Sequence, residues 1–245
     1  MIKDFKSALI FITILPAGRN TEFSPSGMIR FFPVVGLFLG ALLIAADMLS
    51  SLFWPVPVVA LIDVLFLAAV TGAFHLDGLG DTADGLFSHR SPQRALEIMK
   101  DSRTGMMGLV AVFSILALKT AGIYSLKSAG TGADILVVML IVPAYARGGM
   151  LFGIKFLKYG RQNTGTGLEF FKQPLPAKHF VFLSIPLVIS LYLGITGILL
   201  NLVFALVVFL ILMFYKSKMG CITGDMLGAM TEITEAVLFL AAGAV

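Results

Sequence analysis

The sequence predicts an all-α, polytopic helical integral membrane protein, and two observations support this fold class. Of its 245 residues, 58% are hydrophobic and only 13% are charged, with a mean hydropathy of +0.96. Soluble domains are less apolar. In addition, the apolar residues fall into runs of about 20, the length of helix that crosses a hydrocarbon core. This composition excludes a disulfide-stapled extracellular domain, a disordered chain and a nucleic-acid binder.

Seven apolar runs are long enough to be considered as spans, and they lie at residues 28–54, 55–74, 105–126, 133–156, 179–197, 198–215 and 227–245. No internal repeat or low-complexity tract divides them. We therefore expect one domain over residues 1–245. Nothing in the sequence predicts the oligomeric state.

The amino-terminal stretch 2–15 differs from these spans. It carries Lys3, Asp4 and Lys6 ahead of an apolar run that is too short to cross a bilayer. We expect an interfacial helix here. A cleaved signal peptide is the alternative, but the acidic residue in the basic region and the poor cleavage sequence at 16–18 argue against it.

Basic residues predict the orientation, because Lys and Arg in short loops are retained on the cytoplasmic side. The turns at 54–55 and 194–197 carry no basic residue, and the link 126–133 carries only Lys127, so we expect all three outside. The basic clusters fall on the opposite side of an alternating seven-span chain, and they comprise Lys3, Lys6, Arg19, Arg30, Arg90, Arg94, Lys100, Arg103, Lys155, Lys158, Arg161, Lys172, Lys178, Lys216 and Lys218. The loop after the second span is therefore expected to face the cytoplasm.

That loop is rich in acids. It holds five of the fourteen acidic residues of the chain, namely Asp77, Asp81, Asp84, Glu97 and Asp101. If the second span continues as a helix into this stretch, the carboxylates at 77, 81 and 84 follow an i, i+4, i+7 spacing on one face. Three anions on one face repel one another unless a cation lies between them. A divalent ion with oxygen ligands fits, and Mg²⁺ binds a few carboxylates together with substrate phosphates, so we expect Asp77, Asp81, Asp84 and Asp101 to hold it.

Cations follow the acids in sequence at Arg90, Arg94, Lys100 and Arg103. Guanidinium groups suit phosphate oxygens. Acids beside cations indicate a site for a metal-bridged polyphosphate. Two alternatives stay open from spacing alone: a solvated loop whose bases only satisfy the positive-inside rule, and an ion pathway, although a transporter places its ionisable groups at mid-membrane.

Glycines at 78, 80 and 85 lie among the acids. Each costs about 1 kcal/mol relative to Ala in a helix interior. We expect another backbone or a bulky ligand to approach closely there.

Polar residues elsewhere have two interpretations each. Arg147 either snorkels toward the cytoplasmic interface or reaches the phosphates. Asp225 follows Thr223 at a helix entrance and either caps that helix or contacts substrate. His75 either packs between helices or acts as a base.

Acids within the other apolar runs are expected to be paired or functional, because a lipid-facing carboxylate is costly. Glu232 and Glu235 are one turn apart in the last run. Asp47, Asp63 and Lys119 are expected to form a structural polar cluster nearer the outer side.

The residues carry a resemblance to a known family. The runs HLDGLGDTADG at 75–85 and RALEIMKDSRTG at 94–105 closely resemble cobalamin synthase, the adenosylcobinamide-GDP ribazoletransferase family. FITILP at 11–16, FPVVG at 32–36 and TGDMLGA at 223–229 are also similar to segments of that family. The resemblance therefore runs in order along nearly the whole chain.

This resemblance implies an Mg²⁺-dependent transferase of the cytoplasmic (inner) membrane. Its substrates would be adenosylcobinamide-GDP and α-ribazole or its phosphate, and its products adenosylcobalamin or its phosphate, and GMP. Together, the resemblance and the residue pattern assign catalysis to Asp77, Asp84 and Asp101. They assign substrate contacts to His75, Arg90, Arg94, Lys100, Arg103, Arg147 and Asp225.

A second, weaker resemblance is to the CDP-alcohol phosphotransferases, whose pattern begins Asp-x-x-Asp-Gly. Asp81, Asp84 and Gly85 match that start, and Asp101 lies close to the place of a third aspartate. Gly105 stands near the position of the fourth. A phospholipid enzyme of this kind is therefore the first alternative, and a small transporter is the second.

Overall fold

The computed structural model describes residues 1–18, 23–130, 132–161 and 167–244, and over these ranges the chain is helical with no strand. A single parallel bridge joins Tyr159 to Ile222. The all-α prediction is confirmed. Arg19 and Val245, which entered the predictions above, lie outside the described residues.

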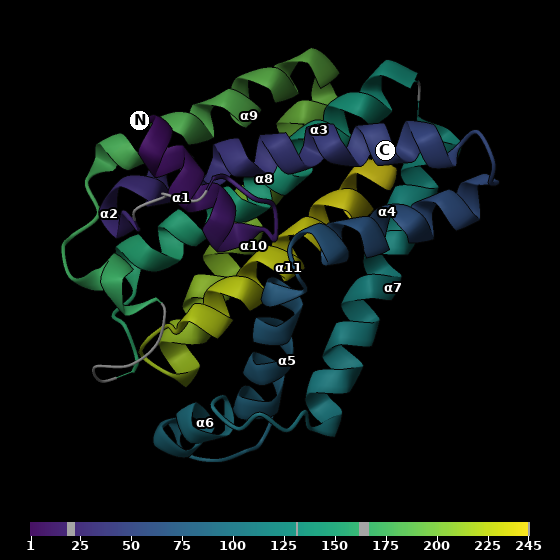
Figure 1. The fold of residues 1–245 in the computed structure, drawn as a ribbon. Helices are drawn as coiled ribbons and strands as arrows, with labels where there is room; N and C mark the ends of the chain where they lie inside the picture. Colours follow the sequence, from purple (N-terminus) through teal and green to yellow (C-terminus); the bar gives the residue numbers. More distant parts are fainter. Residues whose placement is uncertain (19–22, 131, 162–166, 245) are drawn as a thin grey trace.

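The helical elements follow one another along the chain as Figure 1 shows. They are α1 (Ile2–Ile12), α2 (Pro25–Met28), η1 (Ile29–Phe31), α3 (Phe32–Ser50), α4 (Val56–Val70), α5 (Phe74–Leu86), α6 (Pro92–Ile98), α7 (Met106–Ala129), α8 (Gly132–Phe156), η2 (Leu168–Phe171), η3 (Ala177–Leu183), α9 (Ser184–Ser190), η4 (Leu191–Leu193), α10 (Ile195–Lys218) and α11 (Gly224–Gly243).

Five helical stretches are long and apolar enough to cross a membrane: Pro25–Ser50, Met106–Ala129, Gly132–Phe156, Ile195–Lys218 and Gly224–Gly243. The bent pair formed by α4 and α5 makes a sixth if it is one span. The run predicted at 179–197 corresponds to the shorter apolar stretch Ala177–Leu193. A multi-pass helical membrane protein is thus confirmed, whereas the count of seven spans is not.

The break between α4 and α5 decides where the acids lie. The chain turns by 90° there, so α5 runs away from α4 instead of prolonging it (Figure 1). Gly72 and Ala73 both adopt positive φ, at 60° and 55°, which ends α4 and starts a new helix. The second span therefore does not continue straight into this stretch, but the i, i+4, i+7 spacing of the acids holds within α5 itself.

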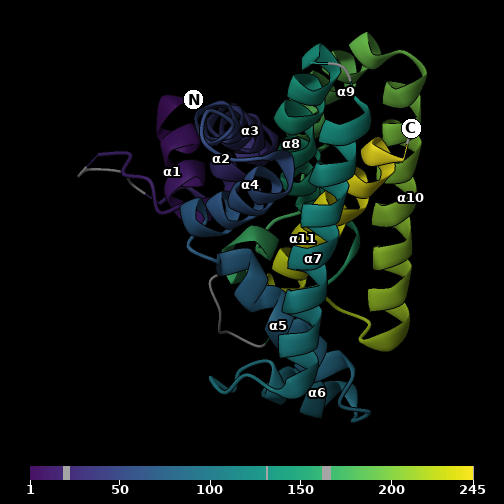
Figure 2. The same cartoon turned by 90° about the vertical axis from the view of Figure 1, so that its right-hand side faces the viewer.

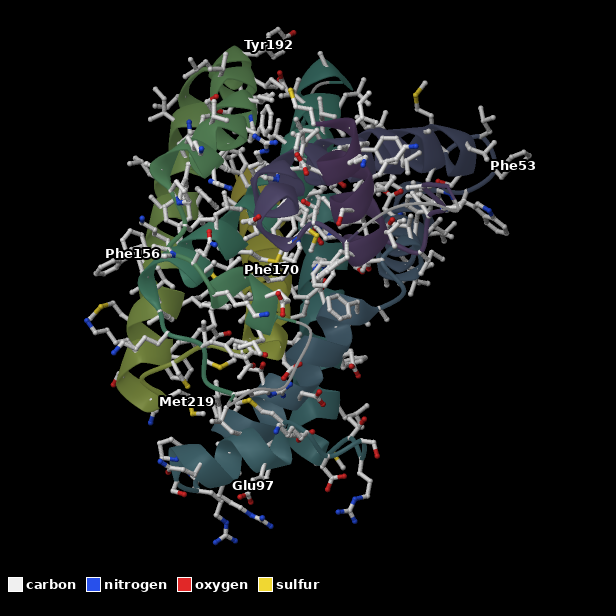
Figure 3. The ribbon with its side chains drawn as sticks, turned by 60° about the vertical axis from the view of Figure 1, so that its left-hand side comes forward. Phe53, Glu97, Phe156, Phe170, Tyr192 and Met219 are labelled. Atoms are coloured by element: carbon white, nitrogen blue, oxygen red, sulfur yellow. The ribbon has the colours of Figure 1, made fainter. Side chains whose placement is uncertain are left out.

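The long helices differ in how much of each is buried. Most of α8 and α11 is buried, whereas most of α7 and α10 is exposed, and Figure 2 shows α11 between α7 and α10. Large apolar side chains project from the surface, including Phe53, Phe156 and Tyr192 (Figure 3). Phe53 is 72% exposed. Such exposure suits helices that face hydrocarbon rather than water.

The amino-terminal helix α1 packs beside the entry to α3. Asp4 accepts hydrogen bonds from Arg30 Nη2 at 2.6 Å and from Ser24 Oγ at 3.0 Å. Ser7 and Ala8, on the same helix, are buried. The predicted helix at the amino terminus is confirmed, and its place at a membrane interface stays a prediction.

Four buried charges connect α7, α8 and α11. Lys119 Nζ lies 2.6 Å from Glu232 Oε2 and 2.5 Å from Glu235 Oε2, and Arg147 Nη1 contacts the other oxygen of Glu235. We call these four residues the buried ion cluster. Two positive and two negative charges balance within it, which is the condition under which charges are tolerated away from water. The paired interior role expected for the two glutamates is confirmed.

A second ion pair joins the ends of α3 and α7. Lys127 contacts Asp47, and the charge of Asp47 also acts on the buried Asp63. The expected cluster of Asp47, Asp63 and Lys119 is therefore corrected: Lys127 takes the place of Lys119. Lys119 lies two turns earlier on α7, where it faces the glutamates of α11 instead.

Removing one charge from the buried ion cluster should destabilise the protein. Glu235→Gln leaves two cations facing one carboxylate, so we expect a loss of about 3 kcal/mol and a Tm lower by about 6 °C or more. Thermal unfolding of the protein in detergent measures this.

The matched control is Glu97→Gln. Glu97 pairs with Arg94 on α6, but both side chains are more than half exposed, so this variant should unfold within a degree or two of the wild type. Equal Tm values for the two variants would contradict the account of the cluster.

Candidate active site at the junction of α5 and α11

Helix α5 presents its acids on one face and its packing residues on another. Leu76 and Leu79 are buried against Ala229 of α11. Asp77 is exposed, and Asp81 and Asp84 are half-buried. The 3.6-residue period places these three carboxylates in one row. We call them the acid row.

Helix α11 comes into direct backbone contact with α5. A Cβ atom placed on Gly78 would lie 2.8 Å from the carbonyl oxygen of Asp225 and 2.9 Å from its Cα. On the facing helix, a Cβ on Gly228 would lie 3.2 Å from the Cα of His75. Glycine on both helices therefore permits the approach that brings Asp225 beside the acid row.

The three glycines of α5 do not share one role. A Cβ on Gly85 would meet Met99 Cγ at 2.6 Å, whereas the nearest neighbour to a Cβ on Gly80 would be Val112 Cγ2 at an ordinary 3.7 Å. A Cβ would therefore clash at Gly78 and Gly85 but not at Gly80, where the backbone of α7 approaches instead: a Cβ on Gly108 would lie 2.9 Å from the Gly80 carbonyl oxygen.

Asp225 does not cap its helix. The Thr223 hydroxyl accepts the hydrogen bond from Met226 N at 3.2 Å and is the N-cap of α11. The Asp225 carboxylate is instead bound by the guanidinium of Arg161. Of the two interpretations of Asp225, capping is thereby excluded, and the carboxylate lies at the junction.

Arg161 reaches Asp225 because a short parallel bridge holds the chain after α8 against the chain before α11. Gly160 N donates to Ile222 O at 2.9 Å, and Ile222 N donates to Lys158 O at 2.9 Å. Arg161 Nη2 also donates to Met99 O at 3.1 Å. Arg161 was not among the predicted site residues. Its only signal in the sequence is membership of a basic stretch, which the positive-inside rule already explains.

Negative charge predominates at this junction. The charges of Asp77, Asp225 and Asp84 all act unfavourably on an ionised Asp81, and Arg161 is the cation that opposes them. Carboxylate oxygens are the donors that Mg²⁺ prefers. Across the described ranges, no three His, Cys, Asp or Glu side chains gather closely enough to hold a metal by themselves. Mg²⁺ commonly takes one or two carboxylates and completes its shell with water and phosphate, so the donor chemistry fits an ion shared with a substrate.

Asp84 also has a structural role. Its two carboxylate oxygens accept hydrogen bonds from Gly105 N at 2.6 Å and Gly108 N at 2.8 Å, at the start of α7. A carboxylate is stabilising at a helix N-terminus because the first amide groups have no partner within the helix. Asp84 thus joins α5 to α7, and Gly105, which stands near the place of the fourth aspartate in the phosphotransferase pattern, supplies one of the amides.

Asp101 lies in the loop, where Arg103 holds it. Arg103 Nη2 is 2.6 Å from Asp101 Oδ2, and the Arg103 backbone N donates to Oδ1 at 3.1 Å. Hydrogen bonds from the Arg103 side chain and backbone lower the pKa of Asp101 to about 2, so it is ionised at neutral pH. In this conformation Asp101 is engaged within the loop rather than with the acid row.

Cations of the loop are exposed. Arg90, Arg94, Lys100 and Arg103 are all exposed in the chain between α5 and α7. Arg94 pairs with Glu97, which Figure 3 shows at the outer edge of the molecule. The structure therefore brings Asp77, Asp81, Asp84 and Asp225 to one junction and leaves these loop cations on the exposed surface of the loop.

Two further predicted substrate contacts are buried. Arg147 is 1% exposed and belongs to the buried ion cluster, so it neither snorkels nor extends to the loop. His75 is also 1% exposed and packs against Gly228. Among the residues that the structure describes, nothing bonds its Nδ1 atom. This placement favours a packing role for His75.

The chain is similar to known proteins along nearly its whole length. The family model described as cobalamin-5-phosphate synthase matches residues 4–243. A protein of Roseiflexus sp. (strain RS-1) named adenosylcobinamide-GDP ribazoletransferase is 35% identical over 234 residues, covering 94% of this chain and 85% of the relative. Proteins of the same name from Shigella boydii serotype 4 (strain Sb227) and Escherichia coli O17:K52:H18 (strain UMN026 / ExPEC) are 36% identical over 249 residues, covering 98% of this chain and 99% of each relative.

No solved structure matches the chain. The family match covers α1 to α11 almost completely, and the relatives match over nearly their full lengths. The family match therefore includes the acid row, Arg161 and Asp225 together. The chain belongs to the cobalamin-5-phosphate synthase family.

Proposed function

We propose that this protein is a membrane-bound adenosylcobinamide-GDP ribazoletransferase. It joins adenosylcobinamide-GDP to α-ribazole, or to α-ribazole 5′-phosphate, and releases GMP. The observation that carries the proposal is the family match over residues 4–243, which contains an acidic junction of α5 and α11 suited to phosphoryl transfer. Neither the phospholipid enzyme nor the transporter is favoured by the relatives.

The transfer requires one bond to form and one to break. A ribose hydroxyl of α-ribazole attacks the phosphorus nearer cobinamide, the bond from that phosphorus to the bridging oxygen breaks, and GMP leaves with that oxygen. The hydroxyl proton passes to a base. Asp77 is the exposed member of the acid row, whereas both oxygens of Asp84 already accept amide hydrogen bonds. We assign proton acceptance to Asp77 on this ground.

A magnesium ion is part of the proposal. Asp81 and Asp84 would hold it together with substrate phosphate, while Asp77 beside them stays available as the base, and the bound ion would neutralise the charge of the pyrophosphate. Arg161 keeps Asp225 turned into the junction. The exposed cations Arg90, Arg94, Lys100 and Arg103 would bind the phosphate oxygens of the donor. Asp101, engaged with Arg103 in this conformation, would join the site when the loop closes over substrate.

The orientation is likewise proposed. The α3–α4 turn and the C-terminal end of α7 lie away from α6 and the α10–α11 connection (Figure 1). This arrangement agrees with the distribution of basic residues, which cluster near α6 and in the last turn of α10. We place the protein in the cytoplasmic (inner) membrane with the acidic junction facing the cytoplasm.

The donor and acceptor can be tested directly. Purified protein supplied with Mg²⁺, adenosylcobinamide-GDP and α-ribazole should release GMP and form a cobamide, and omission of α-ribazole should abolish the release. Chromatographic detection of GMP and of the corrinoid product measures both. CMP release from CDP-diacylglycerol without any cobamide would instead establish the phospholipid enzyme, and no product from either donor would contradict a transferase.

Neutralising one carboxylate of the acid row should abolish turnover. Asp81→Asn removes a charge from the junction, so we expect GMP release to fall at least 100-fold while the protein elutes from size-exclusion chromatography as the wild type does. Glu97→Gln, which removes an exposed acid of the same loop, should stay within about threefold of the wild type. Turnover of Asp81→Asn close to that of Glu97→Gln would refute the role of the acid row.

A further inference from the structure

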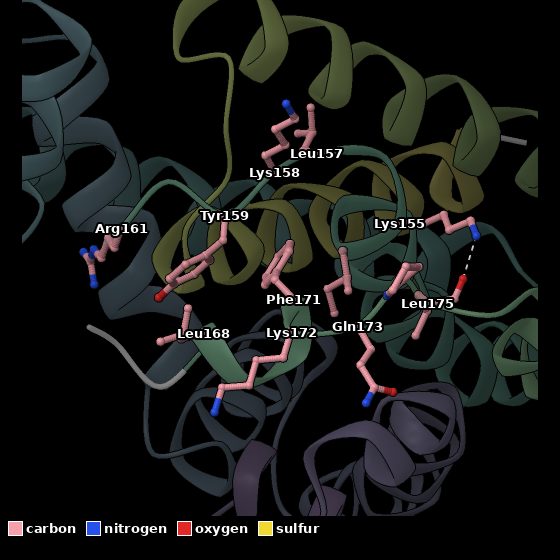
Figure 4. Close-up of a pocket in the computed structure, with 12 residues that line it drawn as sticks. Lys155, Leu157, Lys158, Tyr159, Arg161, Leu168, Phe171, Lys172, Gln173 and Leu175 are labelled. Atoms are coloured by element: carbon pink, nitrogen blue, oxygen red, sulfur yellow. Dashed lines mark hydrogen bonds between the residues drawn. The ribbon is translucent and has the colours of Figure 1, made fainter. Parts of the chain in front are cut away.

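A basic cleft lies between the end of α8 and the segment that carries η2 (Figure 4). Its volume is about 510 Å³, which is within the range of small-molecule sites. Four of its lining residues are cationic and none is acidic; the cations are Lys155, Lys158, Arg161 and Lys172. We call these four residues with Tyr159 and Phe171 the basic cleft.

The cations of the basic cleft are not all engaged. Lys155 Nζ donates to Leu175 O at 2.6 Å and so joins the end of α8 to the segment after η2, which lines the other side of the cleft. Lys172 Nζ lies 2.5 Å from Glu169, and Arg161 pairs with Asp225. Lys158 is exposed and, among the described residues, forms no ion pair. Lys155 and Lys158 thus leave positive charge that an anionic ligand would neutralise.

Two aromatic rings form the middle of the basic cleft. Tyr159 and Phe171 lie with ring centroids 5.0 Å apart and planes inclined by 33°. Figure 4 shows them between the side chains of Lys158 and Lys172. A half-buried aromatic surface flanked by lysines suits a ligand with a planar base and a phosphate, because the base stacks on the ring while the phosphate meets the ammonium groups.

One edge of the basic cleft continues into the acidic junction. Arg161 lines the cleft and at the same time binds Asp225. The bridge between Tyr159 and Ile222 fixes this connection, since Tyr159 precedes Arg161 by two residues. A nucleotide in the basic cleft would therefore have a route for its phosphate toward the acid row.

From this geometry we propose that the basic cleft binds the nucleoside monophosphate portion of a substrate, with its base on Tyr159 and Phe171 and its phosphate at Lys158. The inference rests on the proposed function. Two ligands share this chemistry: the guanosine monophosphate half of the donor and α-ribazole 5′-phosphate.

Equilibrium binding to the full-length protein in detergent, without Mg²⁺, tests this with three probes: GMP, α-ribazole 5′-phosphate and inorganic phosphate. We expect one of the two nucleotides to bind at least tenfold more tightly than the other and than inorganic phosphate, and the tighter one identifies the occupant. Lys158→Ala should weaken that binding about tenfold. Tyr159→Leu should do the same, whereas Tyr159→Phe, which keeps the ring, should bind as the wild type does.

The matched control is Lys218→Ala, which removes an exposed lysine at the end of α10, outside the basic cleft. Its binding should equal that of the wild type. Unchanged nucleotide binding in Lys158→Ala and Tyr159→Leu, or inorganic phosphate binding as tightly as both nucleotides, would overturn the proposal. If wild-type turnover persists in that case, the proposed function stands and only the cleft assignment fails; absence of wild-type turnover is the separate failure of the function.

Discussion

The backbone contact between α5 and α11 is the constraint on which the candidate active site depends. Acids that are about 150 residues apart in sequence meet there because neither helix carries a Cβ at the contact, at Gly78 on one side and Gly228 on the other. The 90° break before α5 directs the acid row toward this contact, and Asp84 fixes the start of α7 to the same helix. The junction is therefore supported from α4, α7 and α11 at once.

Charge balance distinguishes the buried ion cluster from the junction of α5 and α11. In the buried ion cluster, two cations meet two carboxylates, so the charges compensate one another within the protein. At the junction of α5 and α11, four carboxylates meet Arg161. Carboxylates held close together repel one another when no cation lies between them, so the excess of acid favours binding of a cation from outside the chain. The first region holds the helices together, and the second is suited to a metal bound with substrate phosphates.

Much of this organisation was predictable from local sequence. Hydropathy predicted the helical membrane fold, and the spacing of Asp77, Asp81 and Asp84 predicted a common face, because both depend on residues that are close in the chain. The motif at 75–105 also indicated the family that the comparisons support. The break at Gly72 and Ala73 was missed, since an apolar run shows its length but not a change of helix direction.

Long-range pairs were the part that the sequence did not reveal. Arg161 with Asp225, Arg147 with Glu235 and Lys127 with Asp47 each join different helices or a helix and a loop. Periodicity says which residues share a face of one helix, but it does not say which helix lies opposite. Lys119 was accordingly expected near Asp47 and Asp63 although it faces α11, and Arg161 was classed only with the basic loop residues.

The central claim is that close contact of α5 with α11 builds the active site, and two alanine substitutions on α5 test it most directly. Both Gly78→Ala and Gly80→Ala replace a helical glycine by the better helix former. Only the new methyl group at 78 would meet the backbone of Asp225. GMP release should therefore fall at least tenfold in Gly78→Ala and stay near the wild-type rate in Gly80→Ala. Equal rates in the two variants would contradict the account.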